Sequence, residues 1–188
     1  MKKVKILGIM VTLIMVSTGL AFSVEKAPQK VIDLAHSKLS DLGTDPIIVK
    51  AVKEENEKRK SLSQIQEMDN KWKAHAGIAD YMRVIMDSEC GKHLRDIQSS
   101  ARYYAEIFVM DDQGANVAMS DKTSDYWQGD EAKFKKSYNG GLGAVFIDDV
   151  EFDDSAQAYL VQVSVPVRDG ERVIGAITIG IDVDKIQE

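Results

Sequence analysis

Residues 108–131 read Phe-Val-Met-Asp-Asp-Gln-Gly-Ala-Asn-Val-Ala-Met-Ser-Asp-Lys-Thr-Ser-Asp-Tyr-Trp-Gln-Gly-Asp-Glu. The two apolar runs predict strands, and Asp112-Gln113-Gly114 between them predicts a tight turn in which glycine supplies the positive φ. A polar loop that carries Tyr126 and Trp127 follows. A strand pair with such a loop can form a rigid floor and a cover for a small ligand.

The rest of the C-terminal half, residues 101–186, has the two-residue alternation of strands with glycine punctuation. A short helix is expected over 130–138, with Asp130 as its cap, and Asp169-Gly170 predicts a second hairpin turn. The five expected strands cover 102–111, 116–120, 143–152, 157–167 and 172–182.

The N-terminal half has apolar residues at helical spacing. We expect one helix from Pro28 to Leu42, a long one from Pro46 to Trp72, and a third over 78–97 that Gly91 divides. Helices followed by strands indicate an α+β fold with a five-stranded antiparallel sheet. Residues 24–100 form the helical region and 101–188 the sheet region of one structural domain.

The alternation also assigns the two faces of the sheet. One face is aliphatic and should pack on a helix, whereas the other mixes polar and aromatic side chains. A mixed face beneath a polar loop is typical of a small-ligand pocket, although a half-solvated sheet face shows the same alternation. The residues expected on the floor of the pocket are Tyr104, Glu106, Gln162, Ser164 and Thr178.

The loop supplies the other candidate ligand contacts. Tyr126 and Trp127 would stack on the ligand, and carboxylates would pair with its donors, as in cation–π and charge recognition of amines. A neutral polar ligand held by hydrogen bonds is the alternative. The expected loop contacts are Ser120, Asp121, Asp125, Tyr126, Trp127 and Asp130, of which Asp130 could instead only cap the helix.

The N-terminus has the pattern of a secretory signal peptide, with a basic start, an apolar run from Ile6 to Phe22, and small residues before a cleavage site after Ser23. An uncleaved membrane anchor is the alternative. We therefore expect a periplasmic protein. Cleavage would remove three lysines and change the formal net charge from −6 to −9, which disfavours nucleic-acid binding.

The sequence contains no convincing catalytic constellation, so we expect a protein that is not an enzyme and that needs no cofactor. Cys90 and His93 lie one helical turn apart, but two ligands do not make a metal site. The single cysteine is expected to be a buried small apolar residue.

Four segments of the sequence carry a resemblance to a known family: 108–111 with Gly114, Asn116 and Val117, then 120–131, 161–167 and 174–180. Together they resemble the single-Cache (PDC-type, PAS-like) extracytoplasmic sensor domains of chemoreceptors, histidine kinases and cyclases. No arginine precedes Tyr126-Trp127, where members that hold amino acids often have one. The resemblance implies a PAS-like sheet, a ligand pocket between the sheet and the loop after the second strand, and a role in signal transduction such as chemotaxis.

The chain stops at Glu188, directly after the last expected strand. We therefore expect an exported sensor that binds a small polar ligand and acts through a membrane-bound receptor, kinase or cyclase. The alternative is a periplasmic protein-interaction regulator with no small ligand. Homodimerisation through the long helix is compatible with either function.

Overall fold

The structure is a computed structural model that describes residues 25–154 and 156–187, so the expected signal peptide lies outside the described residues. The elements follow one another in this order: α1 (Gln29–Ser37), the 3₁₀ helix η1 (Leu39–Thr44), α2 (Pro46–Glu57), α3 (Leu62–Lys73), α4 (Asp80–Met86), α5 (Glu89–Ser99), β1 (Tyr104–Met110), β2 (Asn116–Met119), α6 (Ala132–Tyr138), the 3₁₀ helix η2 (Asn139–Gly141), β3 (Phe146–Asp153), β4 (Ala158–Asp169), β5 (Arg172–Asp182) and α7 (Val183–Gln187).

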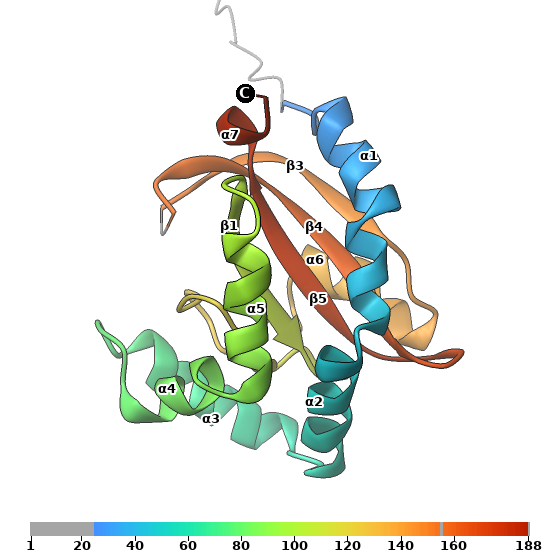
Figure 1. Cartoon of the computed structure of the whole chain (residues 1–188). Coiled ribbons are helices and arrows are strands. Elements are labelled where there is room, and N and C mark those ends of the chain that lie inside the picture. Colours follow the sequence, from blue (N-terminus) through green and yellow to red (C-terminus); the bar gives the residue numbers. More distant parts are fainter. Residues whose placement is uncertain (1–24, 155, 188) are drawn as a thin grey trace, which may run out of the picture.

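The strands form one sheet in the order β2-β1-β5-β4-β3, and all neighbours are antiparallel. Both predicted hairpin turns are present, with Gly114 at φ 83° and Gly170 at φ 60°. The structure confirms the α+β class, with N-terminal helices that precede a five-stranded antiparallel sheet (Figure 1).

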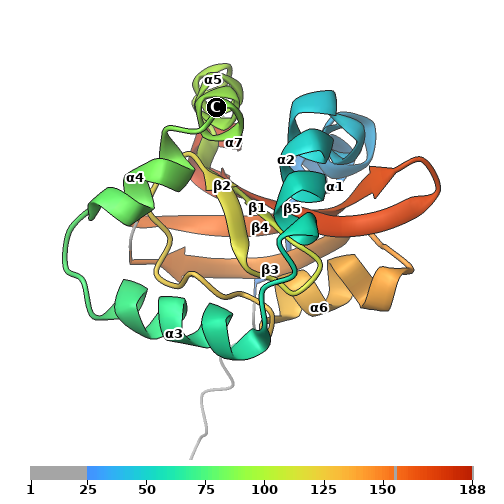
Figure 2. The same ribbon diagram turned by 90° about the horizontal axis from the view of Figure 1, so that it is seen from below.

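Helices cover both faces of the sheet. Figures 1 and 2 show α1, α2 and α5 on one face, and α3 and α6 on the other. The first face is aliphatic, with Val163 and Ile179 packed into the same cluster as Val52 of α2 and Leu94 of α5. The opposite face carries a second cluster that includes Phe108, Met110, Trp72 and Phe134. The predicted division into an aliphatic and a mixed face is therefore correct for most of the sheet.

The prediction of one long helix from Pro46 to Trp72 is wrong. The chain leaves the helical path at Arg59, whose φ is 47°. Ser61 then starts α3, because its hydroxyl accepts from Gln64 N while the Gln64 side chain accepts from Ser61 N. This break lets α2 lie on the aliphatic face and α3 on the mixed face.

Two further helix boundaries differ from expectation. The division within 78–97 occurs at Asp87–Ser88, because the Ser88 hydroxyl accepts from Gly91 N and caps α5. Helix α6 begins at Ala132 with Glu131 before it, so Asp130 is not the helix cap.

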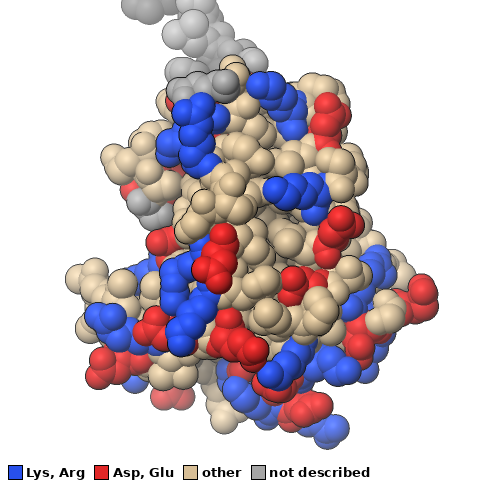
Figure 3. All heavy atoms as spheres, viewed as in Figure 1, with Lys and Arg blue, Asp and Glu red and all other residues tan. Residues whose placement is uncertain are grey.

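On the face shown in Figure 3, acidic and basic side chains are interspersed, with no extended patch of one sign. Within residues 25–154 and 156–187, no helix is long and apolar enough to cross a membrane.

Candidate functional site: a recess over the mixed face of the sheet

A recess lies over the mixed face, beside the first residues of α6. Glu106 and Phe108 of β1 and Gln162 of β4 form its floor. The loop after β2 forms one wall through Thr123, Ser124 and Gln128, and β3 forms another. This is the place at which the sequence predicts a pocket.

The recess consists of two adjoining cavities of about 240 and 330 Å³. They share four lining residues, namely Lys133, Phe152, Asp153 and Gln162. Together they are large enough for a small molecule.

Glu106 is the carboxylate on the floor. Gln162 Nε2 donates to Glu106 Oε1 at 3.0 Å. Burial is the main cause that raises the pKa of Glu106, and the carboxylate of Asp153 adds to the increase. Among the residues that the structure describes, no cation forms an ion pair with Glu106.

Gly180 of β5 lies beside Glu106 and leaves room for it. A Cβ at Gly180 would lie 2.7 Å from Glu106 Cγ and 3.2 Å from Leu160 Cδ1. The absence of a side chain at this position therefore lets Glu106 occupy its place on the sheet.

The lining of the recess is strongly acidic. Lys133 is its one basic lining residue, and its ammonium already pairs with Glu131 at 2.9 Å and lies 5.5 Å from the centre of the Phe108 ring. Seven carboxylates line the two cavities: Glu106, Glu131, Asp148, Asp149, Glu151, Asp153 and Asp154.

Gln128 gives the loop wall an unused acceptor. Its side chain is 1% exposed, and its Nε2 donates to the carbonyl of Asp125 at 2.9 Å. Its Oε1 has no hydrogen-bond partner among the described residues. A buried acceptor of this kind is destabilising unless a donor reaches it.

The loop is held against α3 by side chains that lie far away in the sequence. Asp69 Oδ1 accepts from the backbone N–H groups of Tyr126 and Trp127 at 2.9 and 3.1 Å. Trp72 Nε1 donates to Thr123 O at 2.8 Å. The ammonium of Lys73 bridges Asp69 and Asp125 at 2.8 and 2.9 Å, which raises the pKa of Lys73. These contacts hold this wall of the recess against α3.

The loop also follows the outer edge of β2. Ala115 and Trp127 form an antiparallel bridge, and Asn116 N donates to Tyr126 O at 2.9 Å. The loop thus closes one side of the sheet.

Of the eleven predicted ligand contacts, Glu106 and Gln162 line the recess. Ser164 and Thr178 point to the same face, but they are buried and hydrogen-bonded to each other at 2.8 Å. Ser120 and Asp121 lie at its margin: the Ser120 hydroxyl accepts from Ile107 N and donates to Asp121, which also accepts from Gln98.

The other five predicted contacts do not line the recess. Tyr104 belongs to the aliphatic cluster, because the register of β1 against β5 shifts between Tyr104 and Glu106. Asp125 pairs with Lys73, and Asp130 is exposed.

Tyr126 and Trp127 point away from the recess and anchor the loop. The Tyr126 ring is buried against Trp72, with 5.7 Å between centroids, and Trp127 Nε1 donates to Gln113 O at 2.9 Å. Neither ring lines the recess, whereas Tyr126 lines a separate cavity, so the stacking of these two rings on a ligand stays a prediction.

Four lining residues of the recess were not predicted from the sequence: Thr123, Gln128, Lys133 and Phe152. Phe152 had a signal in the sequence, since it is an aromatic residue between two acidic residues, Glu151 and Asp153. Lys133 had a second signal, because it directly precedes Phe134, a buried residue of the helix that covers the sheet.

Neither the recess nor the rest of residues 25–154 and 156–187 contains a group of three or more His, Cys, Asp or Glu side chains that could hold a metal ion. Cys90 is buried, and burial is the main cause that raises its pKa to about 12. His93 Nε2 contacts Asp45 Oδ2 at 2.9 Å.

No protein-family model matches this chain, and no curated protein matches it. Sensor domains of known structure are similar to it. The sensor domain of the V. cholerae histidine kinase DctB is 13% identical, with a TM-score of 0.46 over 85% of this chain and 50% of that chain. The sensory domain of the Campylobacter jejuni chemoreceptor Tlp3 (CcmL) with isoleucine bound is 14% identical, with a TM-score of 0.42 over 86% and 66%.

The ligand-binding domain of the Pseudomonas aeruginosa PAO1 amino acid chemoreceptor PctC in complex with GABA is 13% identical, with a TM-score of 0.40 over 82% of this chain and 66% of that chain. This chain therefore spans about half of the DctB domain and about two thirds of the two chemoreceptor domains. These three neighbours are ligand-binding or sensor domains of a histidine kinase and of chemoreceptors.

Proposed function

We propose that this protein is an extracytoplasmic, Cache-like sensor that binds a small polar molecule with a protonated amine in the recess. The observation that carries the proposal is Glu106, a buried floor carboxylate that forms no ion pair among the described residues, although the charge of Lys133 acts on it. A ligand ammonium would supply the direct ion pair.

The surroundings of Glu106 favour a cation over an anion. Seven carboxylates and one lysine line the recess, and the lysine is already paired. The exposed ring of Phe152 offers a cation–π surface, and Gln128 Oε1 can accept an ammonium hydrogen. A carboxylate ligand would meet repulsion at the same positions.

Binding would also change the charge of the floor. An ammonium beside Glu106 favours its ionised form, so a proton is released if Glu106 was protonated. Amine affinity should then rise as the pH rises through the pKa of Glu106, while the ligand amine, with an ordinary pKa of about 10.4, stays protonated.

The signal would pass to a membrane-bound receptor, kinase or cyclase. Loop 120–130 joins the recess to α3 through Asp69 and Trp72, so a ligand that contacts Thr123 or Gln128 acts on this connection. A ligand shifts such an arrangement only by its different affinity for the two states. The signal peptide that the sequence predicts supports a periplasmic location.

The test is isothermal titration of the protein with amines, diamines and neutral alcohols of matched length, between pH 5 and pH 8. We expect amines to bind in preference to alcohols, and Glu106→Gln to weaken amine binding about tenfold to a hundredfold, because a hydrogen bond to a charged group is lost. Glu67→Gln on the exposed side of α3 is the matched control.

Equal binding of amines and alcohols, or a Glu106→Gln variant with unchanged affinity, would contradict the proposal. A folded protein that binds none of these compounds would instead favour the protein-interaction regulator.

A further inference from the structure

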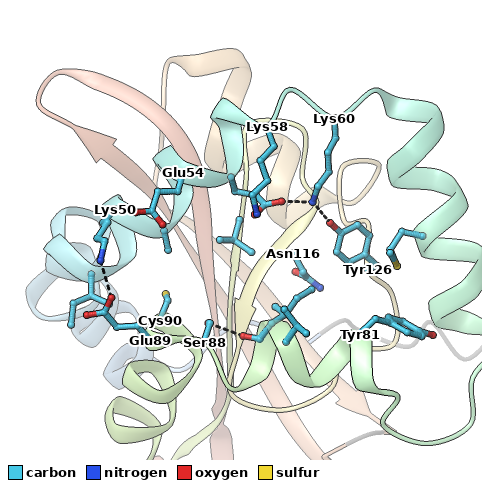
Figure 4. A pocket seen from close by; sticks show the side chains of 17 residues that line it. Lys50, Glu54, Lys58, Lys60, Tyr81, Ser88, Glu89, Cys90, Asn116 and Tyr126 are labelled. Atoms are coloured by element: carbon cyan, nitrogen blue, oxygen red, sulfur yellow. Dashed lines mark hydrogen bonds and ion pairs between the residues drawn. The ribbon is translucent and has the colours of Figure 1, made fainter.

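A second cavity of about 410 Å³ lies on the other side of loop 120–130 from the recess. Residues of α2, α3, α4, α5 and β2 line it, together with Lys58, Lys60 and Tyr126 (Figure 4). Its volume is within the range of small-molecule sites. It shares no lining residue with the recess.

The charged side chains around this cavity neutralise one another. Three lysines and three glutamates line it. Lys50 pairs with Glu89 at 2.9 Å, and Glu55 pairs with both Lys58 and Lys60. Unlike the acidic recess, this cavity therefore favours an uncharged ligand.

Much of the remaining lining is apolar. Met68, Ile85 and Val117 contribute uncharged surface from three different elements, and Ala51 of α2 contributes a small side chain. Apolar walls with a few polar groups are the usual composition of a small-molecule site.

Asn116 is the polar group that points to a particular ligand chemistry. It is 1% exposed, and its Nδ2 donates to Thr123 Oγ1 at 2.9 Å and to Asp125 O at 3.0 Å. The Thr123 hydroxyl itself donates to Asp125 O at 2.7 Å, so its oxygen must accept from the Asn116 amide. These contacts fix which end of the amide is nitrogen.

The other end of this amide lacks a partner. Asn116 Oδ1 has no hydrogen bond among the described residues. Across the cavity wall, the Tyr126 hydroxyl accepts from Lys60 Nζ at 2.9 Å, which leaves the Tyr126 O–H as a donor. The cavity thus offers one buried acceptor and one donor.

We propose that this cavity is a second small-molecule site, which takes an uncharged amphiphile with a carboxamide or similar head. An N–H or O–H of the head donates to Asn116 Oδ1, and its acceptor faces the Tyr126 hydroxyl. The apolar body lies against Ile85 and Val117. This site goes beyond the proposed amine sensor and does not depend on it.

The test is titration of the isotopically labelled protein with hexanamide, followed by NMR. We expect saturable shifts at Asn116 and Val117. N,N-dimethylhexanamide has no N–H to donate, so on the unmodified protein it should bind about tenfold more weakly.

A matched pair of substitutions locates the site. Ala51→Leu fills the cavity, whereas Ala132→Leu places the same added volume at the recess. We expect Ala51→Leu to weaken hexanamide binding about tenfold and Ala132→Leu to leave it unchanged.

Absence of saturable binding, equal affinity for the two amides, or a loss of binding in Ala132→Leu rather than Ala51→Leu would overturn the proposal. The first two outcomes do not depend on how any variant folds. Amine binding and its loss in Glu106→Gln concern the recess alone, so failure of one site is distinguishable from failure of the other.

Discussion

Replacing Asp69 with alanine should remove the main attachment of the loop to α3. Asp69 is 5% exposed, and its Oδ1 accepts two backbone N–H groups, those of Tyr126 and Trp127. Alanine would leave both donors without this acceptor. A buried unpaired donor costs about 1–3 kcal/mol, and water that enters the site would recover part of that cost. We therefore expect the free energy of unfolding to fall by about 2–4 kcal/mol.

The contribution of Lys73 is kept out of this figure, because half of its side chain is exposed and surface ion pairs contribute little. A loss of about 2–4 kcal/mol is a large part of the 5–15 kcal/mol that stabilises a typical domain. The variant should also lose ligand affinity in the recess, since Thr123 and Gln128 belong to the detached loop.

The assay is urea unfolding followed by tryptophan fluorescence, because Trp72 is fully buried beside the loop. Glu67→Ala on the same helix is the control, since Glu67 is exposed and its substitution should change stability by no more than about 0.5 kcal/mol. If Asp69→Ala unfolds at the same urea concentration as Glu67→Ala, the loop is not held by this carboxylate and the reasoning is wrong.

Two further substitutions test other parts of the structure. Gly180→Ala places a Cβ 2.7 Å from Glu106 Cγ, so it should displace Glu106 and weaken amine binding about tenfold. Gly77→Ala is the control, because its Cβ meets nothing within 4 Å, and titration calorimetry should find its amine affinity unchanged. Burial raises the pKa of Asp111 to about 6, above the unfolded value, so this group adds stability as the pH falls from above 6 towards 4. Asp111→Asn keeps an oxygen that can accept from the N–H groups of Gln113 and Ala115 but removes the buried charge. Urea unfolding should show a free energy of unfolding that is about 1–2 kcal/mol higher at pH 7.5 and that no longer changes with the pH between 6 and 4. Unchanged stability at pH 7.5 would contradict this prediction.

The sheet could be predicted from the sequence because its signals are local. Alternation placed Glu106 and Gln162 on one face and Val163 and Ile179 on the other, and each of the two hairpin turns contains a glycine with positive φ. Tyr104 was placed on the wrong face because alternation assumes a regular strand. The register of β1 shifts between Tyr104 and Glu106, so the side chain of Tyr104 points to the opposite face.

The helix break at Arg59 could not be predicted in this way. Arginine is a good helix former and seldom adopts a positive φ. The local signal is the pair Ser61 and Gln64, a capping box in the middle of a charged stretch. Its significance is clear only once α2 and α3 are seen on opposite faces of the sheet.

The site could be predicted only in part, because a loop has no periodicity that fixes side-chain direction. Tyr126 and Trp127 were expected to face a ligand, but their direction is set by Asp69 and Trp72, about 55 residues earlier in the chain. Gln128 faces the recess for the same reason. The composition of residues 120–130 indicated a polar loop, but tertiary contacts decide which of its side chains point into the recess.

The attachment of loop 120–130 along β2 also affects how the molecule meets its own copies. Exposed sheet edges are templates for strand addition and aggregation. Here the outer edge of β2 is occupied at Ala115 and Asn116 by the loop. At the opposite edge, Val150 N donates to Glu25 O, and β3 carries several carboxylates. Both edges are thus protected at these positions against pairing with a strand of a second molecule.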